Sequence, residues 1–374
     1  MSDLWNGTMP KLGFGLMRLP HNEDKSADIE QIKKMVDAFL AAGMRYFDTA
    51  FVYGDSEANT KIALVDRYPR DSYFLVSKLN AWMAMKDADD AKNQINISLE
   101  RLGTDYLDLY LLHGLSDGEH IDVYEKWGLW DYMHELKAAG KIRHFGFSWH
   151  GTADQLEVLL NRHPDTELVQ LQVNYADWTN PAVQSRDNLA VCQKHGIPVT
   201  IMEPVKGGLL ATPPQSVRDI FAQKNPNLSP AGWAIRFAAS QPGVFTVLSG
   251  MSTIGQMEDN LSYMKNFQPM DSSELDVMAK AQEALAAVDQ IACTKCHYCM
   301  PGCPTGIHIP DLFEAMNVYK IYGNLERARQ RYKGSTEHSP KASECVQCGQ
   351  CESACPQHLP IITYLQDCAK TLEV

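Results

Sequence analysis

The sequence predicts a (β/α)8 TIM barrel followed by a small, mainly helical domain that is rich in cysteine. Over about the first 250 residues, short β-rich runs alternate with longer amphipathic stretches, the pattern of parallel strands joined by crossover helices. Eight such alternations favour a closed barrel over an open sheet. The cysteines mark the second part, because all 10 except Cys192 follow residue 290.

The barrel strands are expected where β-branched and aromatic residues cluster. We predict them at 12–16, 44–48, 73–78, 106–113, 143–148, 168–174, 198–202 and 244–249. Helices are expected between them, for example at 28–42, 89–102 and 124–139, where apolar residues recur every three or four positions. A glycine follows the end of each of these three segments, as is common at helix C-termini: Gly43, Gly103 and Gly140.

The length of 374 residues exceeds that of a typical single domain. We place the barrel at 1–268, a linker helix at 269–290 and the cluster domain at 291–374. A polar break at 269–273 precedes the linker helix, and Ser273 begins a capping-box-like start. Between the cysteine motifs, 311–331 has helical periodicity that is interrupted at Gly323.

Eight of the later cysteines form two copies of C-x2-C-x2-C-x3-C-P, the bacterial spacing for a [4Fe-4S] cluster. The fourth cysteine of such a motif binds the other cluster in two-cluster ferredoxins. The predicted ligand sets are therefore Cys293, Cys296, Cys299 and Cys355 for one cluster, and Cys345, Cys348, Cys351 and Cys303 for the other. Zinc sites and disulfides are the structural alternatives.

Composition limits the classes of partner. The formal net charge of −12, from 46 acidic and 34 basic residues, argues against a protein that binds nucleic acid. No apolar run approaches the ~20 residues of a membrane span, and the first residues do not resemble a signal peptide. We expect a cytoplasmic protein with reduced thiols, in which Cys192 and Cys368 are buried structural residues. The oligomeric state is not predicted.

Four polar residues stand at or just beyond the ends of successive predicted strands. Asp48 and Tyr53 follow the second strand, Lys78 ends the third and His113 ends the fourth. Each alone has an ordinary structural explanation, such as a cap or a hydrogen-bonded core residue. Because barrel enzymes place catalytic groups at the carboxyl ends of their strands, the four are expected to converge on one active site.

Residues 9–265 resemble the aldo-keto reductase family, through Asp48-Thr-Ala-x-x-Tyr53-Gly54, the strand ending in Lys78, His113, and Gly146-Phe-Ser148. The resemblance implies that Tyr53 is the general acid, that Lys78 and Asp48 tune it, and that His113 orients a carbonyl. We expect Lys78 to lower the pKa of the Tyr53 phenol from about 10. Relatives that reduce carbon-carbon double bonds carry an acid at the His113 position, so the histidine favours carbonyl chemistry.

The same resemblance implies a nicotinamide cofactor, NADP(H) or NAD(H). Its implied contacts are Ser148, Gln172, Met202, Glu203, Ser249, Gly250, Gln256, Asp259 and Asn260. Relatives that prefer NADP place basic side chains near the positions of Gly250 and Gln256, so neither cofactor is favoured here. Trp82 and Trp149 are the candidate substrate contacts.

The second domain resembles two-cluster ferredoxin-like domains fused behind reductase barrels. Its clusters are structural, exchange electrons with a protein carrier, or sense redox state. The preferred interpretation is a carbonyl reductase for a small aldehyde, ketone or alcohol, with structural or accessory clusters. The alternative is an electron-transfer or redox-sensing protein whose barrel binds nucleotide. Five basic residues could either dock an acidic electron carrier or form a solvated helix face: Lys320, Arg327, Arg329, Arg331 and Lys333.

Overall fold

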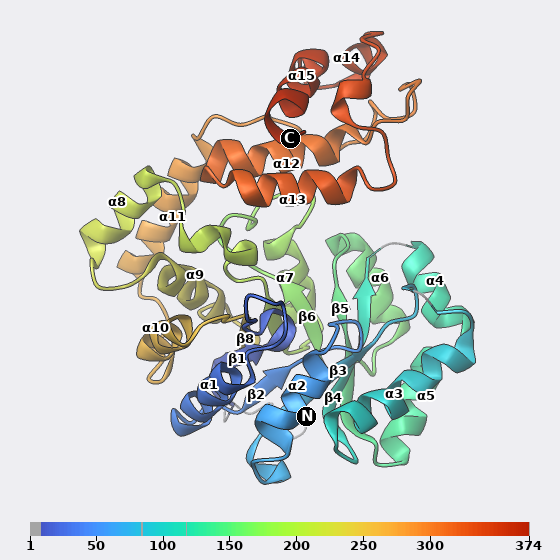
Figure 1. Cartoon of the computed structure of the whole chain (residues 1–374), viewed down its shortest axis with the longest axis vertical. Helices are drawn as coiled ribbons and strands as arrows, with labels where there is room; N and C mark the ends of the chain where they lie inside the picture. The colour runs from blue at the N-terminus through green and yellow to red at the C-terminus, as the bar shows by residue number, and fades with distance from the viewer. Residues whose placement is uncertain (1–8, 84, 117, 374) are drawn as a thin grey trace. The chain divides into compact units, whose positions relative to one another are not determined.

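The computed structural model describes residues 9–83, 85–116 and 118–373 (Figure 1). The chain divides into two compact units. One contains Met1–Ala211 and Asn227–Met278, and the other contains Thr212–Pro226 and Ala279–Val374. The boundaries predicted from sequence, at 268 and 290, remain predictions.

The first unit is a closed barrel of eight parallel strands in sequence order, as predicted. The strands are β1 (Leu12–Gly15), β2 (Tyr46–Asp48), β3 (Phe74–Leu79), β4 (Leu107–Leu115), β5 (Ile142–Trp149), β6 (Val169–Gln172), β7 (Val199–Met202) and β8 (Val244–Ser249). Strand β1 closes the ring by pairing with both β2 and β8. Because all strands are parallel, their carboxyl ends meet at one mouth.

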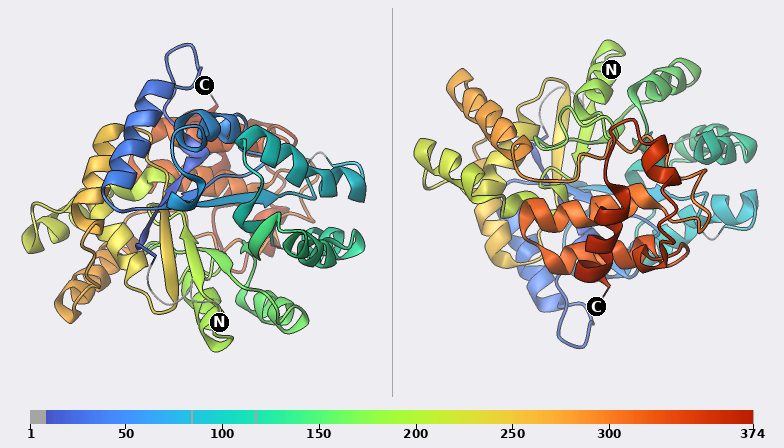
Figure 2. Two further views of the ribbon diagram at one scale, coloured as in Figure 1. Left: turned by 90° about the horizontal axis from the view of Figure 1, so that it is seen from below. Right: turned by 90° about the horizontal axis from the view of Figure 1, so that it is seen from above.

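Helices surround the strands, as the two further views show (Figure 2). Those of the barrel region are α1 (Ile29–Ala41), α2 (Ser56–Thr60), α3 (Ala88–Leu102), α4 (Gly118–Lys126), α5 (Leu129–Ala138), α6 (Ala153–Arg162), α7 (Ser185–Lys194), α9 (Pro230–Ala239) and α10 (Ile254–Met264). Short 3₁₀ or π segments are η2 (Leu16–Arg18), η3 (Lys61–Val65), η4 (Arg70–Ser72) and η5 (Lys206–Ala211). The prediction of one helix at 124–139 is wrong, because Gly128 takes a left-handed φ of 62° and separates α4 from α5.

The alternation of side chains along each strand separates two apolar cores. The inner one fills the barrel and includes Tyr46, Val76 and Leu111. The outer, larger one lies between strands and helices and includes Phe47 and Phe147. Inward positions near the carboxyl ends of the strands are therefore the ones that can present polar groups to the mouth.

The second unit is mainly helical. Its helices are α8 (Gln215–Lys224), α12 (Ile309–Tyr322), α13 (Leu325–Ser335), α14 (Gln350–Ala354) and α15 (Ile361–Leu372), with η6 (Ala342–Glu344), and α11 (Ser272–Ala286) leads into it. Helices α12 and α13 lie side by side and meet at Gly323, whose φ of 66° produces the predicted interruption (Figure 1). None of the described helices is long and apolar enough to cross a membrane.

Candidate active site and cluster sites

The four predicted catalytic residues lie together at the barrel mouth. Lys78 on β3 is completely buried, and its Nζ donates to Asp48 Oδ1 at 2.5 Å and to the carbonyl oxygen of Thr49 at 2.7 Å. The same Nζ lies 5.0 Å from the centroid of the Tyr53 ring. The Tyr53 ring meets the His113 ring edge to face, with centroids 5.6 Å apart. The phenol therefore sits between a buried ammonium and an imidazole.

Asp48 has a second partner that the sequence did not reveal. Gln170 on β6 donates its Nε2 to Asp48 Oδ2 at 3.1 Å, so both carboxylate oxygens accept hydrogen bonds. Burial raises the pKa of Asp48, Lys78 and Gln170 offset part of this effect, and the net direction is upward. Burial alone would lower the pKa of Lys78, but Asp48 reverses this and raises it. We treat the two as an ion pair because both Asp48 oxygens and the ammonium have partners.

The expectation of a lowered pKa for Tyr53 is wrong. Burial raises the pKa of the phenol; Lys78 lowers it, but Asp48 offsets part of that effect, and the net direction is upward. Tyr53 is thus a protonated phenol at neutral pH. The positive charge of Lys78 favours the phenolate form, in the direction opposite to burial.

His113 is neutral at pH 7. Burial, followed by the positive charge of Lys78 and by His150, holds the pKa of its imidazole well below its ordinary value of about 6.5. Its Nδ1 is buried and has no hydrogen-bond partner among the described residues. A neutral ring retains one N–H, so it can donate to a carbonyl oxygen beside Tyr53.

Of the two predicted substrate contacts, only Trp82 lies at this site. It is 42% exposed, donates its Nε1 to the carbonyl oxygen of His113 at 3.1 Å and stacks on His120 with ring centroids 4.5 Å apart. Gly114 permits this approach, because a Cβ there would lie 3.0 Å from the indole.

Trp149 lies elsewhere and is not part of the mouth. It occupies an outward position of β5, is 1% exposed, and donates its Nε1 to Asn188 Oδ1 at 3.1 Å. The alternation along β5 explains the difference, since Ser148 and Trp149 must face opposite sides of the strand.

The predicted cofactor residues on β5 to β7 lie at adjacent strand ends. Ser148 Oγ accepts from the Gly114 N–H at 2.7 Å, which leaves its hydroxyl proton for a ligand. Gln172 is aligned with Met202 in the β6–β7 register. Glu203 follows β7 with a left-handed φ of 54°, an uncommon conformation for a residue other than glycine.

The remaining predicted cofactor residues follow β8. Ser249 is 7% exposed and the exposed Gly250 comes next. The Gln256 and Asp259 side chains already accept hydrogen bonds from the protein. Gln256 Oε1 accepts from the Ser252 N–H at 2.7 Å, and Asp259 Oδ2 accepts from the Ser229 hydroxyl at 2.8 Å. By contrast, the buried Asn260 Oδ1 has no partner among the described residues. An unsatisfied buried acceptor fits a ligand that offers a donor.

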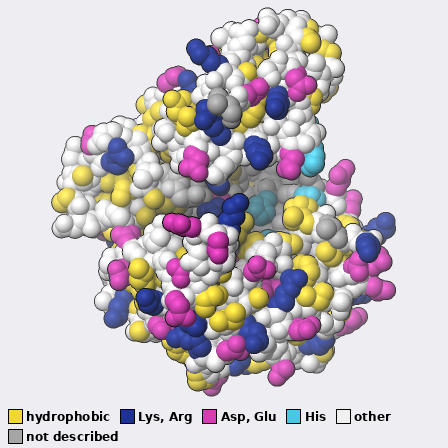
Figure 3. All heavy atoms as spheres, in the orientation of Figure 1, with side chains coloured by type: hydrophobic (Ala, Val, Ile, Leu, Met, Phe, Trp, Pro, Cys, Tyr) yellow, Lys and Arg dark blue, Asp and Glu magenta, His cyan; other side chains and the backbone are white. Residues whose placement is uncertain are grey.

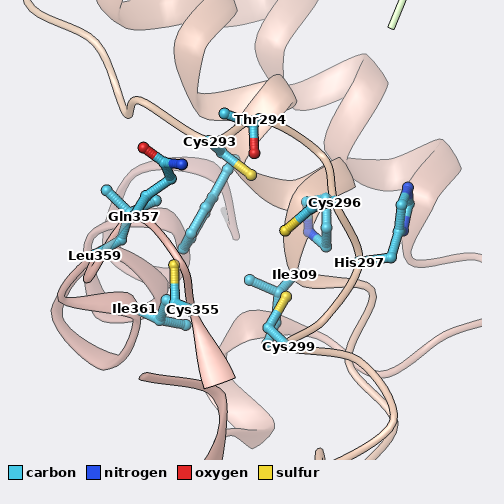
Figure 4. Close-up of a pocket in the computed structure, with 12 residues that line it drawn as sticks. Cys293, Thr294, Cys296, His297, Cys299, Ile309, Cys355, Gln357, Leu359 and Ile361 are labelled. Atoms are coloured by element: carbon cyan, nitrogen blue, oxygen red, sulfur yellow. The ribbon is translucent and has the colours of Figure 1, made fainter. Parts of the chain in front are cut away.

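The second unit contains two pockets lined by cysteines. Three cysteines of the first motif, Cys293, Cys296 and Cys299, line one pocket together with Cys355 of the second. Figure 4 shows the four sulfur atoms pointing into the same space. The other pocket is lined by Cys345, Cys348, Cys351 and Cys303. Each pocket thus brings together one complete ligand set predicted from the sequence.

The cysteine loops share an unusual backbone. The residues before and after the second cysteine of each motif have left-handed φ angles: 56° at Lys295 and 62° at His297, then 56° at Gln347 and 77° at Gly349. Tight turns of this kind direct backbone N–H groups toward a concave site, which favours an anionic group. Both apolar residues, such as Ile309 and Leu359, and polar residues, such as Thr294 and Gln357, line the rest of the first pocket (Figure 4). The donor set and the loops fit iron-sulfur clusters.

All 10 cysteines are free thiols in this structure. Among the residues that the structure describes, no group of three or more His, Cys, Asp or Glu side chains is placed to hold a single metal ion. Burial raises the pKa of both Cys192 and Cys368 to about 12, consistent with inert structural thiols.

The basic residues after the first motif are largely paired within the unit. Arg331 bonds Glu314 at 2.8 Å, and Lys320 bonds Asp289 at 2.7 Å. Arg329 donates to the Thr371 carbonyl oxygen. On the face shown in Figure 3, basic and acidic side chains are interspersed over both units. These contacts favour a solvated helix face over a dedicated docking surface.

Fold and site together define an oxidoreductase barrel joined to an iron-sulfur domain. The model of the Aldo/keto reductase family matches residues 11–283, and that of the 4Fe-4S dicluster domain matches residues 292–359. The chain belongs to the aldo/keto reductase family and carries a dicluster domain after the barrel.

Individual relatives agree with this assignment. An aldo-keto reductase of Mycolicibacterium vanbaalenii is 29% identical over 290 residues, covering 76% of this chain and 90% of that protein. The holo form of the aldo-keto reductase AKR11C1 from Bacillus halodurans is 25% identical, with a TM-score of 0.58, over 74% of this chain and 94% of that one. An aldo/keto reductase from Klebsiella pneumoniae in complex with NADP and acetate is 24% identical, with a TM-score of 0.57 over 73% and 91%, and shares the fold.

Proposed function

We propose that the protein interconverts a small aldehyde or ketone and its alcohol with NADPH or NADH. The placement of the Tyr53 phenol between the Lys78 ammonium and the His113 imidazole carries this proposal. The nicotinamide cofactor, when bound, supplies or accepts a hydride at the carbonyl carbon. Ser148, Gln172 and the unpartnered Asn260 Oδ1 are the residues that we assign to holding it.

In the direction of reduction, the protein supplies the proton. His113 donates to the carbonyl oxygen and orients it beside Tyr53. As negative charge develops on that oxygen, the phenol O–H transfers its proton, and Lys78 stabilises the resulting phenolate. Asp48 keeps Lys78 charged and in place. The reverse reaction begins from the phenolate and returns the proton to Tyr53.

Substitution of the proton donor tests this proposal. Tyr53→Phe is expected to lower kcat by about 10²-fold or more while leaving nicotinamide nucleotide binding nearly unchanged, because only the proton transfer is lost. Tyr132→Phe, which removes a hydroxyl bonded to the Lys92 carbonyl oxygen, is the matched control and should retain activity. Steady-state turnover of a panel of aldehydes and ketones provides the measurement. Equal activity of Tyr53→Phe and wild type would overturn the assignment.

We further propose that the eight motif cysteines hold two [4Fe-4S] clusters in the sets that line the two pockets. Their first role is to crosslink a unit too small to rely on an apolar core alone. A second role, electron exchange with a protein carrier, is favoured by one observation. Cys296 and Cys348 are exposed, and Tyr298 and Val346 on the same loops are 65% and 61% exposed.

The two roles make different predictions under anaerobic conditions. If the clusters are structural or accessory, nicotinamide oxidation requires a carbonyl compound and leaves the cluster EPR signal unchanged. Cluster reduction by NADPH or NADH alone would instead support electron transfer.

A further inference from the structure

Asp177 is a buried carboxylate that the proposed chemistry does not use. It is 1% exposed and lies beside the carboxyl ends of β6 and β7. Its Oδ2 accepts from Gln172 Nε2 at 3.2 Å and from Asn174 Nδ2 at 2.9 Å. Its Oδ1 forms an ion pair with Lys206 Nζ at 2.5 Å. One carboxylate thus connects the end of β6 to the loop after β7.

The first consequence concerns the Gln172 amide. A carboxylate only accepts hydrogen bonds, so the amide must turn its NH₂ toward Asp177 and its oxygen away. The reversed amide would place its oxygen against the charged oxygens of Asp177, which is repulsive. Oε1 of Gln172, to which no hydrogen bond from the described residues is donated, is therefore an acceptor with a fixed direction.

The second consequence concerns the loop after β7, residues 203–208. Glu203 and Lys206 have left-handed φ angles of 54° and 50°, and Gly207 and Gly208 follow with 65° and 97°. Such angles are strained for Glu and Lys and persist only where other contacts hold them. The Lys206–Asp177 ion pair is one such contact. The bond from Asn174 Nδ2 to the Glu203 carbonyl oxygen, at 3.3 Å, is another.

We propose that Asp177 is a positioning residue for the nicotinamide cofactor. It turns Gln172 so that Oε1 accepts from the carboxamide NH₂ of the cofactor, and through Lys206 it holds the 203–208 loop in its strained conformation. This inference rests on the proposed reductase function. It predicts that the loss of Asp177 weakens recognition of the carboxamide NH₂ of the cofactor. The loss of a residue with only a structural role would instead weaken the binding of NADPH and of an analogue without that NH₂ to the same extent.

The experiment compares cofactors with and without that group. Dissociation constants are measured for NADPH and for its reduced 3-acetylpyridine analogue, in which a methyl replaces the NH₂ of the carboxamide. Wild type should bind NADPH about tenfold more tightly than the analogue, the effect of one hydrogen bond. In Asp177→Asn the preference should fall to about twofold or less, because a single amide oxygen must then serve both Lys206 and Gln172.

Two further variants complete the test. Lys206→Gln leaves the Gln172–Asp177 bond intact, so it should keep the preference for NADPH while releasing the cofactor about tenfold faster, and Lys206→Arg should restore the slower release. Asp187→Asn, which makes the same chemical change at an exposed ion pair with Arg186, is the matched control.

The outcomes separate this inference from the proposed function. An Asp177→Asn protein that is folded by circular dichroism, binds NADPH and keeps a tenfold preference would overturn the role of Asp177 but leave the reductase assignment intact. A wild-type protein that binds neither NADPH nor NADH would overturn both.

Discussion

At the scale of single residues, burial decides how the site works. Tyr53 has a positive neighbour in Lys78, yet its pKa is raised, because removing the phenol from water outweighs the attraction of one ammonium that is itself paired with Asp48. The same burial keeps His113 neutral. The site thus holds two uncharged donors next to one ion pair. The raised pKa keeps the Tyr53 proton in place at neutral pH and also makes the phenol a weaker acid than a phenol in water.

The pH dependence of the two reaction directions should reflect this. Reduction needs the protonated Tyr53 phenol, and burial raises its pKa from the ordinary value of about 10, so kcat/KM should be constant from about pH 7 to 9. Alcohol oxidation needs the phenolate, so its rate should rise about tenfold per pH unit over that range. Initial rates in both directions across the pH series provide the measurement. A plateau for oxidation near pH 7 would show that the pKa of Tyr53 is lowered instead.

At the scale of elements, the barrel depends on close contact between neighbouring strands. Gly146 on β5 faces the carbonyl oxygen of Leu168, which also accepts a hydrogen bond from the Phe147 N–H. A Cβ at Gly146 would lie 1.9 Å from that oxygen, and because the obstacle is backbone, no side-chain rotation relieves it. The next inward residue is Ser148, so a displacement of β5 here would also move a residue assigned to the cofactor.

Gly146→Ala should therefore destabilise the protein by at least ~2 kcal/mol, as overpacking against rigid structure does. Gly118→Ala is the control, because apart from chain neighbours and its own helix no atom of the described residues lies within 4 Å of a Cβ built there. Its effect should stay within about 0.5 kcal/mol. Chemical unfolding followed by fluorescence provides the comparison. Equal stability of the two variants would contradict the steric argument.

At the scale of the whole molecule, chemistry and clusters belong to different units. Asp48, Tyr53, Lys78 and His113 lie in the barrel unit, and all eight motif cysteines lie in the other. Each pocket combines three cysteines of one motif with the last cysteine of the other, so both pockets depend on both motifs. Cysteines that are 42 positions (Cys303 and Cys345) to 62 positions (Cys293 and Cys355) apart thus line the same pocket.

Because the motifs share their cysteines, the two pockets predict which substitutions remove the same cluster. Cys293→Ser and Cys355→Ser should each lower the iron content from about eight to about four atoms per chain, and the double variant should lose no more than either one. Combining Cys293→Ser with Cys303→Ser should remove both clusters. Iron analysis and EPR of anaerobically purified protein provide the readout. If Cys293→Ser and Cys355→Ser were additive, each motif would instead hold its own cluster.

The sequence by itself determined the features that depend on local pattern. The eight strands follow from the alternation of β-rich and amphipathic segments, and the two cysteine groups follow from a spacing repeated twice. The four residues proposed to be catalytic could be grouped from the sequence because strand order places successive strand ends at one mouth. Even the break at Gly323 was readable, since it interrupts a clear helical period.

Only the tertiary structure decided what depends on partners distant in the chain. Trp149 points outward because of which face of β5 its position in the strand occupies. The helix break at Gly128 results from the left-handed backbone angle of that residue. The raised pKa of Tyr53 reflects burial by surrounding segments. The contacts of Gln170 with Asp48 and of Asp177 with Lys206 join residues that are distant in the chain. Burial, side-chain orientation and charge pairing depend on many neighbours that are distant in the chain, so a local sequence pattern does not determine them.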